Sequence, residues 1–435
     1  MRRTLATLVA FFSLATLAVT PVGAATKAPA GLPSFYNVPT FSATAPLGTV
    51  LKYQAVAYPG LVGGSAYQVM YVSENYTHKR VPVTGFVVVP TGTAPTAGWP
   101  VLNWNHGTNG MTSICAPSLN PSGEMSPQFL NAIIAKGWEF TASDYQGEGT
   151  AGLMPYLAGV SAAQDSINIV RAAHLNTVGR VKGPFKASTT YVDWGHSEGG
   201  QTAMYVAHIA KSYAPDLTLK ATAAGAAPSQ FFYIYSALQT SHYAYYLLMA
   251  AAGLNAWYGN KLAPLSSVLT PAAIAMLPDL SKGCSATISA DVEPYIAAGH
   301  FNQLVKADPY TIKEWRTLLQ ANDPAGFKTL DTPLLMLQGD VDEQIPVAST
   351  ALLYTQMCAL ASGTARHSVQ RWVYPNQSHS GVISRSYVDM LNWFTYQFNN
   401  DPASASSYIP VGLFGSAPSA TVKDSAGAYQ RQGCA

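Results

Sequence analysis

One stretch of this 435-residue chain, 189-TTYVDWGHSEGG-200, decides the fold. Residues 189–194 predict a buried strand, and the spacing of residues 199–214 predicts a helix soon after it. Between them stands G-x-S-x-G, the strand–turn–helix pattern of a nucleophile elbow. Such a turn strains the backbone of the central serine, Ser197, and glycines at 195 and 199 (Gly195 and Gly199) remove the clash that side chains would cause there. We therefore expect a reactive Ser197 at a helix N-terminus, an ordinary glycine-rich turn being the plainer alternative.

The acid that would support this serine is expected on a later loop. A serine is a poor nucleophile without an oriented base, and in this fold the chain order is serine, acid, histidine. A buried strand at 333–337 leads into 339-GDVDEQIP-346. The spacing Gly-x-x-Asp-x-x-Ile-Pro selects Asp342, with Asp340 as the second choice. Asp340 and Glu343 are interpreted as solvated turn carboxylates.

The base is expected at His379. This histidine follows the last predicted strand, 369–374, and comes after both other members of the expected triad. His367 lies before that strand, and His106 lies upstream of the serine, so neither fits the required order. The alternative for His379 is a solvated loop histidine.

Two backbone N–H groups are expected to hold the oxyanion. One belongs to Glu198, the residue after the serine, and the other to the loop after the predicted strand 100–105. That loop reads 106-HGT-108, in which Gly107 lets the backbone approach closely. Thr108 is therefore the expected second donor, a simple tight turn being the alternative.

The segment 147-GEGTAG-152 matches the G-x-G-x-x-G pattern of dinucleotide sites and follows a predicted strand at 139–142. Ribose binding would need an acidic residue about 20 positions further on, at the end of a second strand. None stands there, so we interpret the segment as a flexible loop at the rim of the active site. No organic cofactor is expected.

Strands alternate with helical segments over most of the chain, which predicts a mainly parallel sheet covered by helices on both faces. An antiparallel-looking pair at the start makes the sheet mixed. The expected strands are 67–72, 83–89, 100–105, 139–142, 189–194, 333–337 and 369–374, and the expected helices are 128–136, 162–175, 199–214 and 384–398.

This rhythm changes between residues 229 and 328, which are largely helical and rich in aromatic side chains. These are core packing or the wall of an apolar site, and as a group they favour an acyl or aromatic substrate over a charged one. We predict an α/β-hydrolase core formed by 25–228 and 329–400, an inserted helical cap or lid at 229–328, and an irregular C-terminal tail at 401–435.

The N-terminus predicts export. Arg2 and Arg3 precede a short apolar run at 5–19, and 22-VGA-24 ends in small residues that signal peptidase accepts. Residues 1–24 are thus expected to be a signal peptide of a secreted protein, an uncleaved anchor being the alternative. Export permits disulfides, and four cysteines allow three pairings: Cys115, Cys284, Cys358 and Cys434. No Cys/His pattern indicates zinc, and no metal is expected.

Composition narrows the class further. Hydrophobic residues make up 48% of the chain and charged residues 11%, which is typical of a protein with a large buried core and excludes a disordered chain. The net charge of +2 comes without a basic run, so no nucleic-acid partner is expected. No obligate protein partner is inferred.

With these residues placed, the sequence resembles the secretory lipase family, the Candida antarctica lipase A-like branch of the α/β-hydrolase superfamily, from about Phe35 to His379. The shared motifs stand in one order: 35-FY-36, 87-VVVP-90, 106-HGT-108, 115-CAPS-118, 144-DYQG-147, 195-GHSEGG-200, Trp315 and Asn322. Glu198 departs from the family pattern, in which small or aromatic residues are common, and brings a carboxylate next to the expected nucleophile.

The resemblance implies a helical lid over an acyl-binding tunnel, hydrolysis of carboxylic esters including triacylglycerols, and disulfides Cys115–Cys284 and Cys358–Cys434. Its implied partner is an ester or lipid substrate, met at a lipid–water interface if it is a lipid. Three alternatives stay open: an esterase for aromatic or polymeric esters, a serine peptidase, and a non-catalytic binding module with a hydrolase fold. Acyl-chain preference, interfacial activation and oligomeric state do not follow from the sequence.

Overall fold

The structure is a computed structural model that describes residues 25–174, 183–361, 369–399, 419–424 and 426–434. The expected signal peptide, His367 and residues 401–418 of the expected tail lie outside these described residues. Within the described ranges, no helix combines the length and the apolar character needed to cross a membrane.

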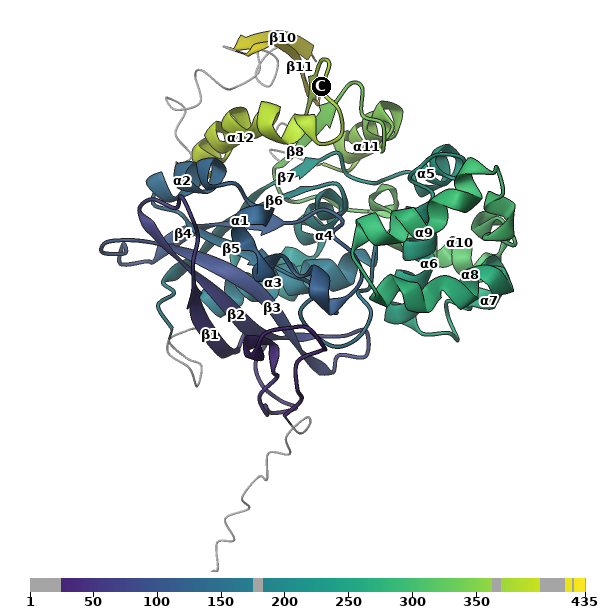
Figure 1. The fold of residues 1–435 in the computed structure, drawn as a ribbon. Coiled ribbons are helices and arrows are strands. Elements are labelled where there is room, and N and C mark those ends of the chain that lie inside the picture. Colours follow the sequence, from purple (N-terminus) through teal and green to yellow (C-terminus); the bar gives the residue numbers. More distant parts are fainter. Residues whose placement is uncertain (1–24, 175–182, 362–368, 400–418, 425, 435) are drawn as a thin grey trace, which may run out of the picture.

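A mixed sheet forms the centre of the molecule (Figure 1). Its strands in the described chain are β1 (Val50–Val56), β2 (Gly64–Glu74), β3 (Arg80–Pro90), β4 (Trp99–Asn105), β5 (Glu139–Ser143), β6 (Ala187–His196), β7 (Thr218–Gly225), β8 (Leu334–Gly339), β9 (Val369–Tyr374), β10 (Ser419–Asp424) and β11 (Gly427–Gly433). They lie in the order β1-β2-β3-β5-β4-β6-β7-β8-β9-β11-β10. The six central strands run parallel, from β5 to β9, and both ends of the sheet are antiparallel.

Helices cover both faces of this sheet. The described α-helices are α1 (Pro121–Glu124), α2 (Pro127–Ala135), α3 (Gly159–His174), α4 (Glu198–Tyr213), α5 (Phe231–Leu238), α6 (Tyr245–Tyr258), α7 (Leu265–Val268), α8 (Pro271–Met276), α9 (Ser285–Ala297), α10 (Lys313–Asn322), α11 (Val347–Leu360) and α12 (Gly381–Asn399). Apolar residues of α3, α4 and α11 pack on one face, and those of α2 and α12 on the other. The mostly parallel, doubly covered sheet confirms the α/β-hydrolase fold expected from the sequence.

The chain order creates a switch point in the sheet between β4 and β6. From β4 the chain moves outward to β5, crosses back over the sheet through α3, and enters β6 on the other side of β4. At such a point the loops after the two neighbouring strands separate and leave a crevice at their carboxyl ends. The loop that begins at His106 and the turn at Ser197 therefore flank the same crevice.

Between β7 and β8 the described chain is helical from α5 to α10. Figure 1 shows these helices gathered to one side of the sheet, beyond its carboxyl edge. Their apolar residues, mainly from α6, α9 and α10, form one buried cluster together with residues from 111–162 of the preceding chain. The disulfide Cys115–Cys284 ties this helical group to the loop after β4, and the Ser285 N–H donates to the Asn109 carbonyl at 2.7 Å.

The C-terminal tail differs from the irregular segment expected for residues 401–435. Strands β10 and β11 pair antiparallel as a hairpin, and β11 also pairs antiparallel with β9, which extends the sheet. The Arg431 guanidinium lies over the Trp372 ring at 4.1 Å, and the disulfide Cys358–Cys434 anchors the end of β11. The hairpin forms because β9 offers it a free edge. Both cysteine pairs are those implied by the family resemblance.

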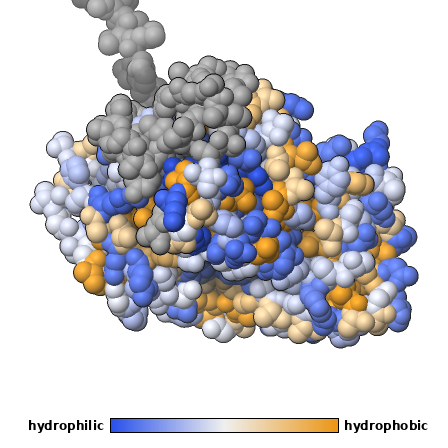
Figure 2. All heavy atoms as spheres, turned by 90° about the horizontal axis from the view of Figure 1, so that it is seen from above, coloured by the Kyte–Doolittle hydropathy of each residue, from blue (hydrophilic) through white to orange (hydrophobic). Residues whose placement is uncertain are grey.

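Most of the hydrophobic residues in the described chain are buried. The large apolar side chains of the strands and covering helices are buried, with only scattered exposed members such as Val62 and Val388. Figure 2 shows hydrophilic and hydrophobic residues interspersed over the face seen from above. The high hydrophobic content therefore reflects a large core.

Candidate active site

Ser197 has the strained backbone expected of a nucleophile elbow. Its φ is 57° and its ψ is −125°, and it stands directly before the first residue of α4. A Cβ at Gly195 would lie 1.9 Å from the Gly199 carbonyl oxygen, and one at Gly199 would lie 1.9 Å from the Asn105 carbonyl oxygen. The Ser197 N–H donates to the Gly225 carbonyl at 2.9 Å. The turn is thus held between β4 and β7, and only glycine fits at the positions two residues before and two residues after the serine.

His379 and Asp342 lie together although 37 residues separate them. The imidazole Nδ1 is 3.0 Å from both carboxylate oxygens of Asp342. The same carboxylate accepts the N–H groups of Gln344 and Ile345. Burial alone would raise the pKa of Asp342, but the imidazole and these two N–H groups together lower it below its ordinary value. An ionised Asp342 requires Nδ1 to carry the proton, which leaves Nε2 free to accept one.

The histidine loop is fixed to the elbow by neighbouring side chains. The His196 Nε2 lies 2.8 Å from the His379 carbonyl oxygen, to which it donates, and the two rings lie 4.6 Å apart. Burial and the nearby His379 lower the pKa of His196 to about 3, so this ring stays neutral. The residue next to the candidate nucleophile therefore positions the candidate base, a role that its place in G-x-S-x-G did not indicate.

Asp340 and Glu343, which the sequence predicted to be solvated turn carboxylates, both accept hydrogen bonds from the backbone. The prediction that they are only solvated is therefore wrong. Glu343 accepts the His379 N–H at 3.0 Å. Asp340 accepts the Asn376 N–H at 2.6 Å. Both carboxylates hold the backbone of the histidine loop, because an exposed loop needs partners for its N–H groups if it is to keep one conformation.

The expected hydrogen bond between the Ser197 hydroxyl and the His379 imidazole is not formed in the described chain. Within the described chain, the Ser197 hydroxyl makes no hydrogen bond. The rings of His196 and His379 are in contact, so the imidazole lies beside the residue that precedes the serine. Contacts of this kind are commonly long in a free enzyme and shorten when substrate binds.

The loop after β4 lies against the elbow, as the oxyanion prediction requires. A Cβ at Gly107 would be 3.5 Å from the Ser197 Cβ. Neither the Thr108 N–H nor the Glu198 N–H donates to another group in the described part of the chain. A buried network lies beneath both loops, in which Asp193 on β6 accepts amide hydrogens of Asn103 and Asn105 on β4 at 2.7 and 2.8 Å.

The Glu198 side chain is buried beside this loop. Its residue is 2% exposed, and neither carboxyl oxygen has a hydrogen-bond partner among the described residues. Burial raises the pKa of Glu198 to about 8, against a smaller lowering by the Thr108 hydroxyl. The carboxyl is consequently neutral at pH 7, which removes a negative charge from the N-terminal end of α4.

The segment 147–152 is not the flexible rim loop expected from its glycines. Glu148, Gly149 and Thr150 are buried, and a Cβ at Gly149 would lie 2.1 Å from the Thr84 hydroxyl oxygen. The positive φ values of Gly147 and Gly149 let the chain fold inward. Glu148 is thereby carried towards His106, the residue that begins the loop after β4.

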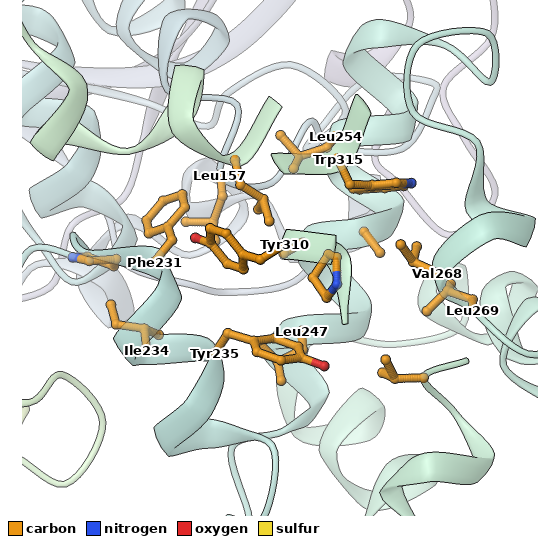
Figure 3. Close-up of a pocket in the computed structure, with 16 residues that line it drawn as sticks. Leu157, Phe231, Ile234, Tyr235, Leu247, Leu254, Val268, Leu269, Tyr310 and Trp315 are labelled. Atoms are coloured by element: carbon orange, nitrogen blue, oxygen red, sulfur yellow. The ribbon is translucent and has the colours of Figure 1, made fainter. Parts of the chain in front are cut away.

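An apolar pocket lies within the helical group, and Leu157 and Pro228 complete its wall (Figure 3). Its cavity volume is about 90 Å³, and the residues that line it include Leu157, Phe231, Ile234, Leu247, Leu254 and Trp315. The lining residue Leu157 contacts the first turn of α4, because its carbonyl oxygen accepts a hydrogen bond from the Gln201 side chain at 3.1 Å. Among the described residues, no cluster of three or more His, Cys, Asp and Glu side chains could hold a metal ion.

A family model described as secretory lipase matches residues 122–406, well over half of the chain. The chain belongs to the secretory lipase family. Membership confirms the resemblance seen in the sequence motifs and supports a hydrolase of the lipase and esterase type.

Two curated relatives are also named as lipases, one of them as a probable inactive lipase. A probable inactive lipase of Mycobacterium tuberculosis (strain CDC 1551 / Oshkosh) is 30% identical over 199 residues, which are 42% of this chain and 43% of that protein. The chain thus spans less than half the length of that relative. Lipase A of Arthroderma benhamiae is 23% identical over 355 residues, covering 75% of this chain and 71% of its own.

Two solved structures share the fold. Candida antarctica lipase A has a TM-score of 0.67 at 16% identity, over 82% of this chain and 83% of its own. The ligand-bound rice cell wall degrading esterase LipA from Xanthomonas oryzae has a TM-score of 0.62 at 17% identity, over 79% of this chain and 95% of its own.

The elbow packing predicts that Gly199→Ala lowers the free energy of unfolding of this chain by at least about 3 kcal/mol, since the new methyl group would overlap the Asn105 carbonyl. Chemical unfolding followed by circular dichroism measures the change. Ser197→Ala is the matched control at the same turn, because it keeps the Cβ. Equal stability of Gly199→Ala and the control would contradict this packing argument.

The raised pKa of Glu198 predicts a pH-dependent loss of stability. The unfolded chain releases this proton near pH ~4.3, whereas the folded chain retains it up to about 8, so rising pH favours unfolding over that interval. Glu198→Gln mimics the neutral acid, so its stability relative to the parent chain should rise by roughly 4 kcal/mol between pH 5 and pH 9. Urea unfolding at both pH values tests this, and a constant difference would show that Glu198 ionises normally.

Proposed function

We propose that this chain is a secreted serine hydrolase of carboxylic esters, a lipase or esterase in which Ser197, His379 and Asp342 form the catalytic triad. The single observation that carries the proposal is the His379–Asp342 pair, held by His196 against the strained Ser197 turn. A strained serine at a helix N-terminus costs conformational free energy and does not stabilise the fold. The imidazole of His379, oriented by Asp342, would supply the base that this serine needs.

In the proposed reaction His379 accepts the Ser197 proton while the serine oxygen attacks the ester carbonyl. Asp342 keeps the imidazole in the tautomer with Nδ1 protonated and stabilises the imidazolium that forms. His379 then gives the proton to the departing alcohol, which leaves an acyl group on Ser197. Water repeats the sequence and releases the acid.

The negative oxygen of the tetrahedral intermediate would be held by the N–H groups of Thr108 and Glu198. Both are free in the described chain, and they flank the crevice at the switch point of the sheet. The dipole of α4 adds to their effect because its positive end faces the serine. A neutral Glu198 side chain is compatible with this role, whereas an ionised one would oppose the developing charge.

The pocket of Figure 3 supports an apolar acyl group as the part of the substrate bound beyond the ester. Its lining is almost entirely aliphatic and aromatic, and it adjoins the first turn of α4 through Leu157. Burial of hydrocarbon in such a pocket contributes about 0.8 kcal/mol for each methylene group. The helices between β7 and β8 would then act as the cap, with the bounds 229–328 proposed from the sequence.

Replacement of the nucleophile is the first test. Ser197→Ala should lower kcat for nitrophenyl esters at least about 10³-fold and abolish labelling by a fluorophosphonate, because no other oxygen is placed to attack. Ser212→Ala, on the exposed end of the same helix, is the matched control and should behave as the parent chain. Circular dichroism checks that both variants fold.

Two results would overturn the proposal. Retained hydrolysis by folded Ser197→Ala would exclude Ser197 as the nucleophile. A parent chain that neither reacts with fluorophosphonate nor hydrolyses any ester would favour a non-catalytic binding module, a result made relevant by the relative named a probable inactive lipase.

The pocket predicts a change in acyl-chain preference. Leu247→Trp fills part of it, so kcat/KM for a nitrophenyl ester of a long acyl chain should fall on the order of tenfold, with little change for the acetate. Leu262→Trp, on the exposed surface of the same helical group, is the matched control. An equal loss for short and long esters would show that the acyl chain binds elsewhere.

A further inference from the structure

A buried acid–imidazole pair lies behind the oxyanion loop and has no part in the proposed triad. The Nε2 of His106 is 3.5 Å from a carboxyl oxygen of Glu148, and the two side chains are 1% and 0% exposed. Neither that nitrogen nor either Glu148 oxygen has a conventional hydrogen-bond partner among the described residues. Burying polar groups without hydrogen bonds costs free energy of folding, so the closeness of His106 and Glu148 requires an explanation.

The other ring nitrogen of His106 determines the tautomer. The Nδ1 lies 2.7 Å from the Gly107 carbonyl oxygen, much closer than the Asn109 amide nitrogen at 3.4 Å, so the carbonyl is its main partner. A carbonyl oxygen only accepts, so Nδ1 must carry the hydrogen of this bond. In a neutral ring Nε2 is then a bare acceptor, and it faces Glu148. A protonated Glu148 carboxyl can donate to it, which gives Nε2 and one carboxyl oxygen a partner.

This arrangement acts on the peptide that joins Gly107 to Thr108. The Gly107 carbonyl and the Thr108 N–H belong to one planar trans peptide and point in opposite directions. When His106 holds the carbonyl on its own side, the Thr108 N–H is turned to the other side. Glycine gives the peptide freedom to rotate, so an external bond is needed to select one orientation.

We propose that Glu148 and His106 are a positioning pair, which fixes the Gly107–Thr108 peptide so that the Thr108 N–H is presented to the oxyanion. This inference rests on the proposed function, because it assigns the pair to the same ester-hydrolysing site. Glu148 selects the His106 tautomer, His106 orients the peptide, and the peptide presents its hydrogen to the reacting carbonyl oxygen. Neither side chain touches substrate.

The surroundings of the pair favour its neutral form. Burial lowers the pKa of His106 and raises the pKa of Glu148, and the nearby carboxyls of Glu198, Asp144 and Glu124 raise the latter further. The Tyr145 ring stacks on the imidazole at 4.2 Å and its hydroxyl donates to the His106 carbonyl at 3.4 Å. Tyr145 therefore contacts one face of the His106 ring, while in the plane of the ring Nδ1 meets the Gly107 carbonyl and Nε2 faces Glu148.

Matched substitutions of His106 separate positioning from packing. The amide nitrogen of Asn can replace Nδ1 as the donor to Gly107, whereas that of Gln reaches only the place of Nε2. We expect His106→Asn to keep kcat within about threefold, and His106→Gln to lower kcat on the order of tenfold or more at unchanged KM, because an oxyanion donor acts in the transition state. Equal kcat values for the two folded variants would overturn the proposal.

Substitutions of Glu148 test the tautomer, and do so even if the histidine variants fail to fold. The amide of Glu148→Gln still donates to Nε2, so its kcat should stay close to that of the parent chain. Glu148→Met removes the donor and should lower kcat on the order of tenfold at unchanged KM. A tenfold loss in Glu148→Gln would instead indicate an imidazolium–carboxylate pair and contradict the proposal.

Ser197→Ala distinguishes this inference from the proposed function. If Ser197→Ala is inactive while folded His106→Gln and Glu148→Met match the parent chain in kcat, the positioning role fails and the triad stands. If Ser197→Ala remains active, the proposed function fails first, and with it any oxyanion role for Thr108.

Discussion

The strained backbone at Ser197 is the constraint on which the rest of the site depends. Its positive φ is maintained by close packing of β4, β6 and β7, in which backbone carbonyls approach Gly195 and Gly199 too closely for any side chain. Isolated, this conformation would cost on the order of 1–3 kcal/mol, so the surrounding sheet has to impose it. Because the same packing positions the loop after β4, the candidate nucleophile and the candidate oxyanion donors have a common framework.

Buried polar groups surround this framework in unusual number. Asp193 binds amides across β4 and β6, Asp342 binds the imidazole of His379, and Glu148 faces His106, each at nearly complete side-chain burial. Buried polar networks of this kind favour one arrangement because any slip leaves a group unpaired. The site therefore relies on acids in two states: ionised at Asp342, where N–H groups and an imidazole converge, and neutral at Glu198, where they do not.

Local patterns in the sequence predicted the elements that carry strong signals. The strand before Ser197, the helix after it and the strands leading to Asp342 and His379 all lie where their apolar spacing placed them. Strand β7 was missed because its stretch 221-ATAAG-225 is small and Ala-rich, and it becomes a strand only between β6 and β8. The hairpin β10–β11 was missed because its pairing depends on the free edge of β9. Both β7 and the β10–β11 hairpin form strands because of the neighbouring strands with which they pair in the sheet.

The sequence by itself determined the fold, the family and the chemically reactive residue types in their chain order, because these are written in short motifs and local periodicity. Only the tertiary structure decided which other residues contact these reactive side chains and hold their loops in place. His196 holds the His379 loop, Glu343 and Asp340 brace its backbone, and Glu148 reaches His106 from a segment that looked like an exposed loop. These contacts join residues up to 183 positions apart. Their geometry arises from strand order at the switch point, which no local pattern encodes.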